Sequence, residues 1–176
     1  MTNKELISKG AKIGKNVILD KSVKIINPKN LIIKKNTRID FNTILICKKK
    51  MIIESNVHIG PNSILRSHQT LTIGKNTLIS SFVDIFTSTS EVKSEINYSH
   101  PLTRKNSKND KKINIGSFSF IGSHCVILPG ANLTTGTHLN ALTLVNFKTK
   151  PWHIYSGNPP KIIGKIDGSK IRKLYK

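Results

Sequence analysis

One short pattern occurs four times in this chain at a spacing of twenty residues. Its four copies are Ile13–Val17, Ile33–Thr37, Ile53–Val57 and Ile73–Thr77. A fixed period near twenty residues is typical of a solenoid, in which each repeat packs only on its neighbours. Within each period a large aliphatic residue recurs every six residues, as at Ile13, Leu19 and Ile25. The remaining eight residues complete the coil, so the pattern predicts three short flat faces joined by tight corners.

The spacing also predicts which residues fill the coil and which form its corners. One large aliphatic residue in each run of six points into a narrow prism and fills it. An asparagine stands fourth in every copy, and asparagine tolerates the positive φ that tight corners need. Because adjacent coils stack at about 4.8 Å, these amides are expected to form one ladder. Its members are Asn16, Asn36, Asn56 and Asn76.

The six-residue spacing stops after Ile85 and resumes at Ile115, from where it continues without exception to Val145. The later coils are therefore eighteen residues long, and the segment between the two series is a long loop that leaves one corner. Long loops on rigid scaffolds often carry function. We expect one β-helix domain over residues 1–176, with coils at about 13–86 and 113–150, an inserted loop at about 87–112 and a C-terminal tail at 151–176.

Composition limits the possible partners. The net charge of +20 suits a nucleic-acid protein, but the lysines are scattered and no aromatic platform or recognition helix appears. We therefore expect no nucleic acid, and favour small phosphorylated ligands or anionic glycans. No apolar run is long enough to span a membrane and no signal peptide is evident, which predicts a cytoplasmic protein without stable membrane insertion. Of the two cysteines, Cys125 is expected in the core and Cys47 as an exposed thiol.

Two segments carry a resemblance to a known family. The run Ile121–Gly130, which ends in Ile-Leu-Pro-Gly, resembles the hexapeptide-repeat acyltransferases, as does Ile115-Gly116 before it. The tail Pro151–Lys161 is similar to the Trp-x-Ile-Tyr-x-Gly-Asn-Pro ending of bacterial sugar O-acetyltransferases in that superfamily. The resemblance implies an all-β, left-handed parallel β-helix that forms homotrimers, with active sites between neighbouring subunits.

The same resemblance implies an activity. It points to transfer of an acetyl group from acetyl-CoA, with no metal, to the hydroxyl of a sugar or glycan acceptor, or to an amino sugar. The expected setting is the synthesis of bacterial surface polysaccharide. Acetyl-CoA would lie along the C-terminal coils and the acceptor near the long loop.

Acetyl transfer needs a base that reaches the acceptor group, and donors for the oxyanion that forms on the carbonyl. Histidine suits the first role, because its ordinary pKa is near 6.5. His100 is the leading candidate, because it lies in the inserted loop and its His-Pro pair resembles that of the galactoside and maltose acetyltransferases. His58 and His68 are alternative bases or acceptor contacts, since both fall one coil before the loop. Asn62 and Glu91 are weaker candidates for acceptor binding.

The cofactor contacts can be carried over only in part. Ser123 and Ala141 match small positions that border the pantetheine arm in the resembling enzymes. Lys148, Lys161 and Lys165 are expected to meet the CoA phosphates, although Asn146 and Phe147 interrupt the motif of the family there.

Two other function classes remain as alternatives. A non-catalytic trimeric scaffold is compatible with the same coils. A γ-carbonic-anhydrase-like protein is disfavoured, because its zinc site uses two histidines five residues apart and none of the six histidines here has that spacing.

Overall fold

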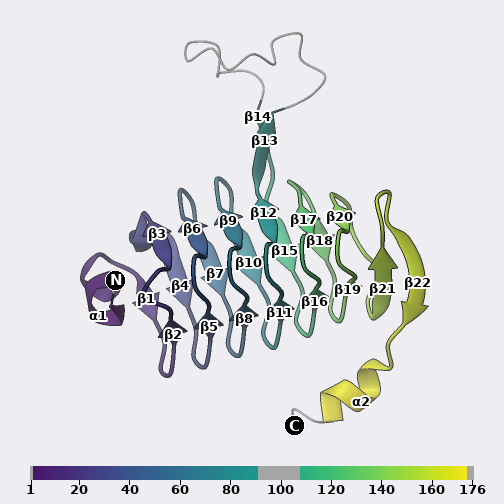
Figure 1. Cartoon of the computed structure of the whole chain (residues 1–176), viewed down its shortest axis with the longest axis horizontal. Helices are drawn as coiled ribbons and strands as arrows, with labels where there is room; N and C mark the ends of the chain where they lie inside the picture. The colour runs from purple at the N-terminus through teal and green to yellow at the C-terminus, as the bar shows by residue number, and fades with distance from the viewer. Residues whose placement is uncertain (1, 91–107, 174–176) are drawn as a thin grey trace.

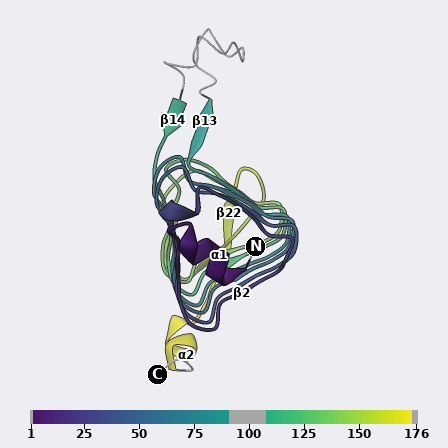
Figure 2. The same ribbon diagram turned by 90° about the vertical axis from the view of Figure 1, so that its left-hand side faces the viewer.

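The computed structural model is a three-sided parallel β-helix of about six turns, as the sequence predicts. It describes residues 2–90 and 108–173. Figure 1 shows the coils stacked in a row, and Figure 2 shows their common triangular outline along the helix axis. Each side of the prism is one parallel sheet, and we call these face A, face B and face C.

The faces take one strand from each coil in turn. Face A contains β1 (Lys12–Ile13), β4 (Leu31–Ile33), β7 (Met51–Ile53), β10 (Leu71–Ile73), β15 (Ile113–Ile115) and β18 (Asn132–Leu133). Face B contains β2 (Ile18–Leu19), β5 (Arg38–Ile39), β8 (His58–Ile59), β11 (Leu78–Ile79), β16 (Phe120–Ile121) and β19 (His138–Leu139), followed by β21 (His153–Ser156) and β22 (Lys161–Lys165). Face C contains β3 (Lys24–Ile26), β6 (Ile44–Ile46), β9 (Ile64–Arg66), β12 (Asp84–Phe86), β17 (Val126–Ile127) and β20 (Leu144–Val145).

The interior is the aliphatic column that the spacing predicts. On face B, for example, Ile39 pairs with Ile59 and Ile59 with Ile79 in the parallel register, and all three side chains are buried. The smaller inward residues include hydroxyls that donate to backbone carbonyls, some on the next coil and others within the same coil. Thr43 Oγ1 lies 3.1 Å from the oxygen of Gly60, and Ser63 Oγ lies 3.2 Å from that of Ser80. Each buried hydroxyl is thereby satisfied.

The corner between faces A and B carries the predicted amide ladder. Asn16, Asn36 and Asn56 each donate from Nδ2 to Oδ1 of the asparagine one coil later, at 3.1, 3.1 and 2.8 Å. All four members have φ between 54° and 58°. After Asn76 the column continues with Phe118, Gly136 and Trp152. Glycine is needed at position 136 because the Trp152 ring occupies the space that a Cβ would fill.

Both open ends of the helix are covered. Helix α1 (Asn3–Ser8) begins with a capping box at Thr2 and buries Leu6 against the first coil. At the other end β21 extends face B in parallel, and β22 folds back on it antiparallel. A short 3-10 turn (Pro28–Asn30) and helix α2 (Gly168–Lys173) complete the described elements. The cover at each end limits edge-to-edge pairing of strands.

The inserted segment leaves the corner between faces C and A as a hairpin. Strands β13 (Ser88–Ser90) and β14 (Lys108–Asp110) pair antiparallel and project away from the prism (Figure 1). The insertion therefore begins where the break in the six-residue spacing predicts it. His100 and Glu91 lie outside the described residues.

Cys47 is buried, so the expectation of an exposed thiol is wrong. Inward positions alternate along this strand, and Thr43, Leu45 and Cys47 all face the interior. The alternation thus continues one step into the eight-residue part of the coil. Cys47 Sγ lies 3.9 Å from Met51 Sδ, and burial raises the pKa of the thiol to about 12.

Close stacking of the coils predicts a cost for a side chain at Gly116. A Cβ there would lie 2.5 Å from the backbone nitrogen of Thr135 on the next coil, which cannot move independently. Gly116→Ala should lower the free energy of unfolding by about 1–3 kcal/mol, measured by chemical denaturation. Gly164→Ala is the control, because its Cβ would meet only the Ile154 side chain at 3.4 Å. Equal stability of the two variants would contradict this account of the coil spacing.

Candidate active site

A half-buried carboxylate lies at the root of the hairpin. Asp84 is on β12 of face C, four residues before β13 begins, and its side chain faces outward. In the parallel register its neighbours are Ile64 on the preceding coil and Val126 on the following coil. Burial in this aliphatic setting raises the pKa of Asp84, and the charge of Arg66 offsets part of the shift. A carboxylate with a raised pKa is a stronger base than an exposed one.

Arg66 and Phe86 lie beside this carboxylate on the same face. They pair in the register of β9 and β12, and the guanidinium carbon of Arg66 lies 5.0 Å from the centroid of the Phe86 ring. The stacking holds a positive charge close to Asp84. Face C therefore presents a base, a cation and an aromatic surface next to the insertion.

Sequence reasoning missed Asp84 because it followed the inward aliphatic residues. The sequence did contain a signal for Asp84. Among the outward residues that pair with it in register on successive coils of face C, Asp84 is the one acid. These outward residues are Lys24, Ile44, Ile64, Asp84, Val126 and Leu144.

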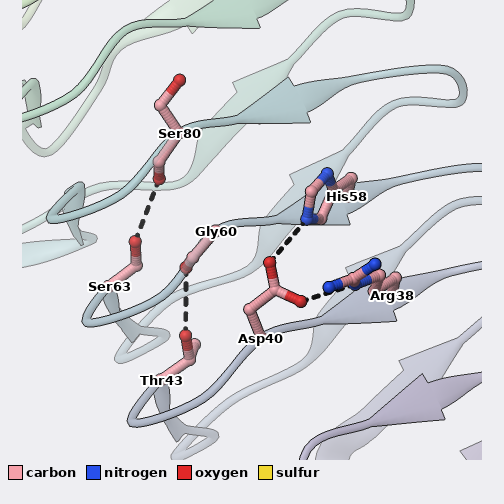
Figure 3. A network of polar contacts seen from close by, with 7 residues as sticks. All are labelled: Arg38, Asp40, Thr43, His58, Gly60, Ser63 and Ser80. Carbon is pink, nitrogen blue, oxygen red and sulfur yellow. Dashed lines mark hydrogen bonds and ion pairs between the residues drawn. The ribbon is translucent and has the colours of Figure 1, made fainter.

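His58 belongs to a different cluster, on face B (Figure 3). Its Nε2 lies 2.7 Å from Asp40 Oδ2, and Arg38 Nε donates to Asp40 Oδ1 at 2.6 Å. The Asp40 side chain is 14% exposed, against 42% for His58 and 62% for Arg38. Desolvation acts to raise the pKa of Asp40, but the hydrogen bonds and charges of His58 and Arg38 outweigh it and lower the pKa overall.

The predicted acceptor residues do not converge in the described structure. His58 is on face B, and Asn62 is at the next corner, between faces B and C, with φ 58°. His68 lies between β9 and β10, at the corner between faces C and A from which the hairpin leaves. Of these three residues, His68 is the one that shares a corner with the insertion.

The predicted cofactor residues fall into separate groups. Ser123 and Ala141 occupy equivalent turns of successive coils at the corner between faces B and C, where Leu142 N donates to the Ser123 oxygen at 3.0 Å. Lys161 and Lys165 are the two ends of β22, beyond the last coil. The backbone of Lys148 forms a single parallel β-bridge with Asn132 on face A, across the prism from Ser123. Lys161 pairs with Ser156, on the side of β21 towards the corner of Ser123 and Ala141, whereas Lys165 pairs with His153 at the opposite end of β21. The small residues at this corner therefore have one lysine near them, and the other two lysines lie elsewhere.

The remaining outward histidines pack on aromatic rings. His124 stacks on Phe82 with ring centroids 4.8 Å apart, and His138 stacks on Phe120 at 4.4 Å. His138 is half-buried, and this burial lowers its pKa. Within residues 2–90 and 108–173, no group of three His, Cys, Asp or Glu side chains is arranged to hold a metal ion. None of the helices in this part of the chain is long and apolar enough to cross a membrane.

The lowered pKa of Asp40 predicts a pH-dependent contribution to stability. Unfolded aspartate titrates near 3.9, so Asp40 stabilises the fold fully above that value and loses this contribution as pH falls through its lower folded pKa. Asp40→Asn should reduce the free energy of unfolding at neutral pH by on the order of 1 kcal/mol. Denaturation curves at decreasing pH should show the two proteins converging. A difference that stays constant down to about pH 2 would contradict the assignment.

Comparison with known proteins adds independent information. No protein-family model matches the sequence. A Staphylococcus aureus (strain MRSA252) protein with the provisional name acetyltransferase SAR2635 is 38% identical over 55 residues, which is 31% of this chain. The match spans only 28% of the length of that relative.

Solved structures match nearly the whole chain. AntD, an N-acyltransferase from Bacillus cereus, solved as a variant in complex with dTDP and coenzyme A, has a TM-score of 0.90 and 27% identity, and the match covers 99% of this chain and 95% of AntD. A maltose O-acetyltransferase from Clostridium difficile 630 shares the fold at 19% identity and a TM-score of 0.61, over 93% of this chain and 74% of that enzyme. In its six-residue repeats and its parallel β-helix, the chain is similar to the hexapeptide-repeat β-helix acyltransferases.

Proposed function

We propose that the protein transfers an acyl group from acyl-CoA to a sugar that is linked to a nucleotide. The observation that carries this proposal is the similarity to AntD along 99% of the chain. AntD has been solved with dTDP and 3-hydroxybutyryl-CoA, and a variant of it with dTDP-4-amino-4,6-dideoxyglucose and coenzyme A. Acetyl-CoA is the donor that the sequence resemblance favours. The acceptor group is a sugar hydroxyl or a sugar amine.

The reaction defines what the site must supply. The acceptor oxygen or nitrogen attacks the thioester carbonyl and gives a tetrahedral oxyanion, after which the carbon–sulfur bond breaks. The acceptor loses one proton and the CoA thiolate gains one, so the products are an ester or amide and free CoA. A base near the acceptor accelerates the first step.

We assign the general-base role to Asp84. Its carboxylate is half-buried at the root of the hairpin, its pKa is raised by burial, and Arg66 lies close enough to influence it. His100, from the same insertion, is the alternative base that the sequence suggests. For the donor, the track formed by Ser123 and Ala141 suits the narrow pantetheine arm, with Lys161 and Lys165 near the phosphates.

We further propose that the protein acts as a homotrimer. Large apolar side chains are exposed along the corner between faces B and C, where Phe82 is 48% and Leu142 is 70% accessible. Burial of this corner against another copy would remove it from water and bring the track at Ser123 close to a neighbouring subunit. Sedimentation equilibrium would test this proposal, and a monomeric mass would contradict it.

Replacement of the proposed base separates the two candidates. Asp84→Asn keeps the shape of the side chain but cannot accept the proton, so turnover should fall about 10²-fold or more while CoA binding is unchanged. His100→Gln, measured in parallel by release of free CoA thiol, should retain most of the activity. Full activity of Asp84→Asn together with loss in His100→Gln would move the role to His100.

The pH profile gives a second readout on the same two variants. A carboxylate base with a raised pKa should give wild-type activity that falls on the acid side, at a higher pH than an ordinary aspartate would. His100→Gln should keep that limb. Loss of the limb in His100→Gln would contradict the assignment of Asp84.

A further inference from the structure

A large cavity lies at the foot of the hairpin, on the side facing face A. Its volume is about 780 Å³, which is within the range of about 300–1,000 Å³ that small-molecule sites occupy. The wall is made by outward residues of face A and by the two residues that follow β14. The polar members are Thr70, Thr72, Asn114, Asn132, Lys111 and Lys112.

The outward column of face A changes its chemistry where the cavity begins. On the first coil it is Lys12, and on the next two coils it consists of Ile32 and Ile52, which pair in register. On the later coils it becomes Thr72, Asn114 and Asn132, and Asn114 Nδ2 donates to Asn132 Oδ1 at 3.2 Å. The run of uncharged polar residues that follows Ile52 thus coincides with the cavity.

The backbone around Lys111 is fixed to the preceding coil. Lys111 N donates to the Thr87 oxygen at 3.0 Å, and Ile113 N donates to the Thr70 oxygen at 3.1 Å. The aliphatic stem of Lys111 lies over Gly130, where an added Cβ would approach Lys111 Cδ to 3.2 Å. The backbone at Gly130 has φ +87°, a conformation that glycine adopts more readily than other residues.

The charge of the cavity is positive. Its lining includes two lysines and no acidic residue, and both lysines are exposed. The nearest carboxylate along the chain is Asp110, the last residue of β14. Two lysines in one lining, together with hydroxyl and amide donors, suit a phosphate or diphosphate.

We propose that this cavity binds the diphosphate of a nucleotide-bearing ligand, with Lys111 and Lys112 on the phosphates and Asn114 and Asn132 available to the rest of the ligand. The proposal rests on the proposed function, because both substrates of that reaction carry a diphosphate. One source is the nucleotide of the sugar acceptor. The other is the CoA of the donor, whose diphosphate would then lie here and not at Lys161 and Lys165. Lysine contacts predict that affinity falls as salt rises.

The chain offers a matched control for the cavity lysines. A smaller cavity of about 270 Å³ on the same edge is lined by Lys29 and Lys50. Lys50, Thr70 and Lys112 precede residues that pair in register, Met51, Leu71 and Ile113. Lys29→Gln/Lys50→Gln therefore removes the same charge as Lys111→Gln/Lys112→Gln, at equivalent corner positions but outside the larger cavity.

The test is calorimetric titration of the full chain and both double variants with dTDP, CoA and inorganic pyrophosphate. Lys111→Gln/Lys112→Gln should weaken pyrophosphate and one of the two nucleotides by about tenfold or more, whereas the control pair should lose much less. Loss of dTDP affinity identifies the acceptor as the source, and loss of CoA affinity identifies the donor. Thermal unfolding checks that both variants are folded.

Two results would overturn the proposal. One is wild-type affinity of Lys111→Gln/Lys112→Gln for all three probes, and the other is an equal loss in the control pair, which would indicate general surface charge. Failure of the proposed function would look different. In that case the wild-type protein would bind neither nucleotide, while pyrophosphate would still report on whether the cavity holds a diphosphate.

Discussion

The stacking of equivalent residues on successive coils is the constraint on which the rest of the structure depends. Each inward aliphatic residue, each corner asparagine and each backbone strand bonds or packs with its counterpart one coil away. The distance between coils is fixed by strand hydrogen bonds, so glycines such as Gly74 and Gly116 are needed where a Cβ would meet the next backbone. Ladders of like residues, as at Asn36 and Asn56, satisfy corner amides without any contribution from a distant segment.

A rigid stack of this kind places function where its regularity is interrupted. The insertion leaves the corner between faces C and A, and the unusual outward residues occur on either side of it. Asp84 with Arg66 is on face C, and the cavity with Lys111 and Lys112 is on face A. The hairpin thus separates a site suited to proton transfer from one suited to phosphate. Ser123 and Ala141 lie on the corner opposite face A, which is the corner that the proposed trimer would bury.

Much of the fold could be predicted from the sequence, because its signal is one-dimensional. The period of twenty residues, the inward residues and the asparagine ladder require only the pairing of each residue with its counterpart one coil later. Cys47 was misplaced because the six-residue spacing does not say how far strand alternation continues into the longer part of the coil. Asp84 was missed because the pattern describes the interior, whereas Asp84 is at an outward position whose neighbours depend on the register across the insertion. The cavity at Lys111 could not be found either, since it joins residues from coils separated by the loop.

If this β-helix uses acyl-CoA, the purified protein should bind CoA in a calorimetric titration. Binding should be saturable at close to one CoA per subunit, and acetyl-CoA should compete. Absence of binding by a folded protein would contradict the acyl-CoA assignment and favour a non-catalytic scaffold.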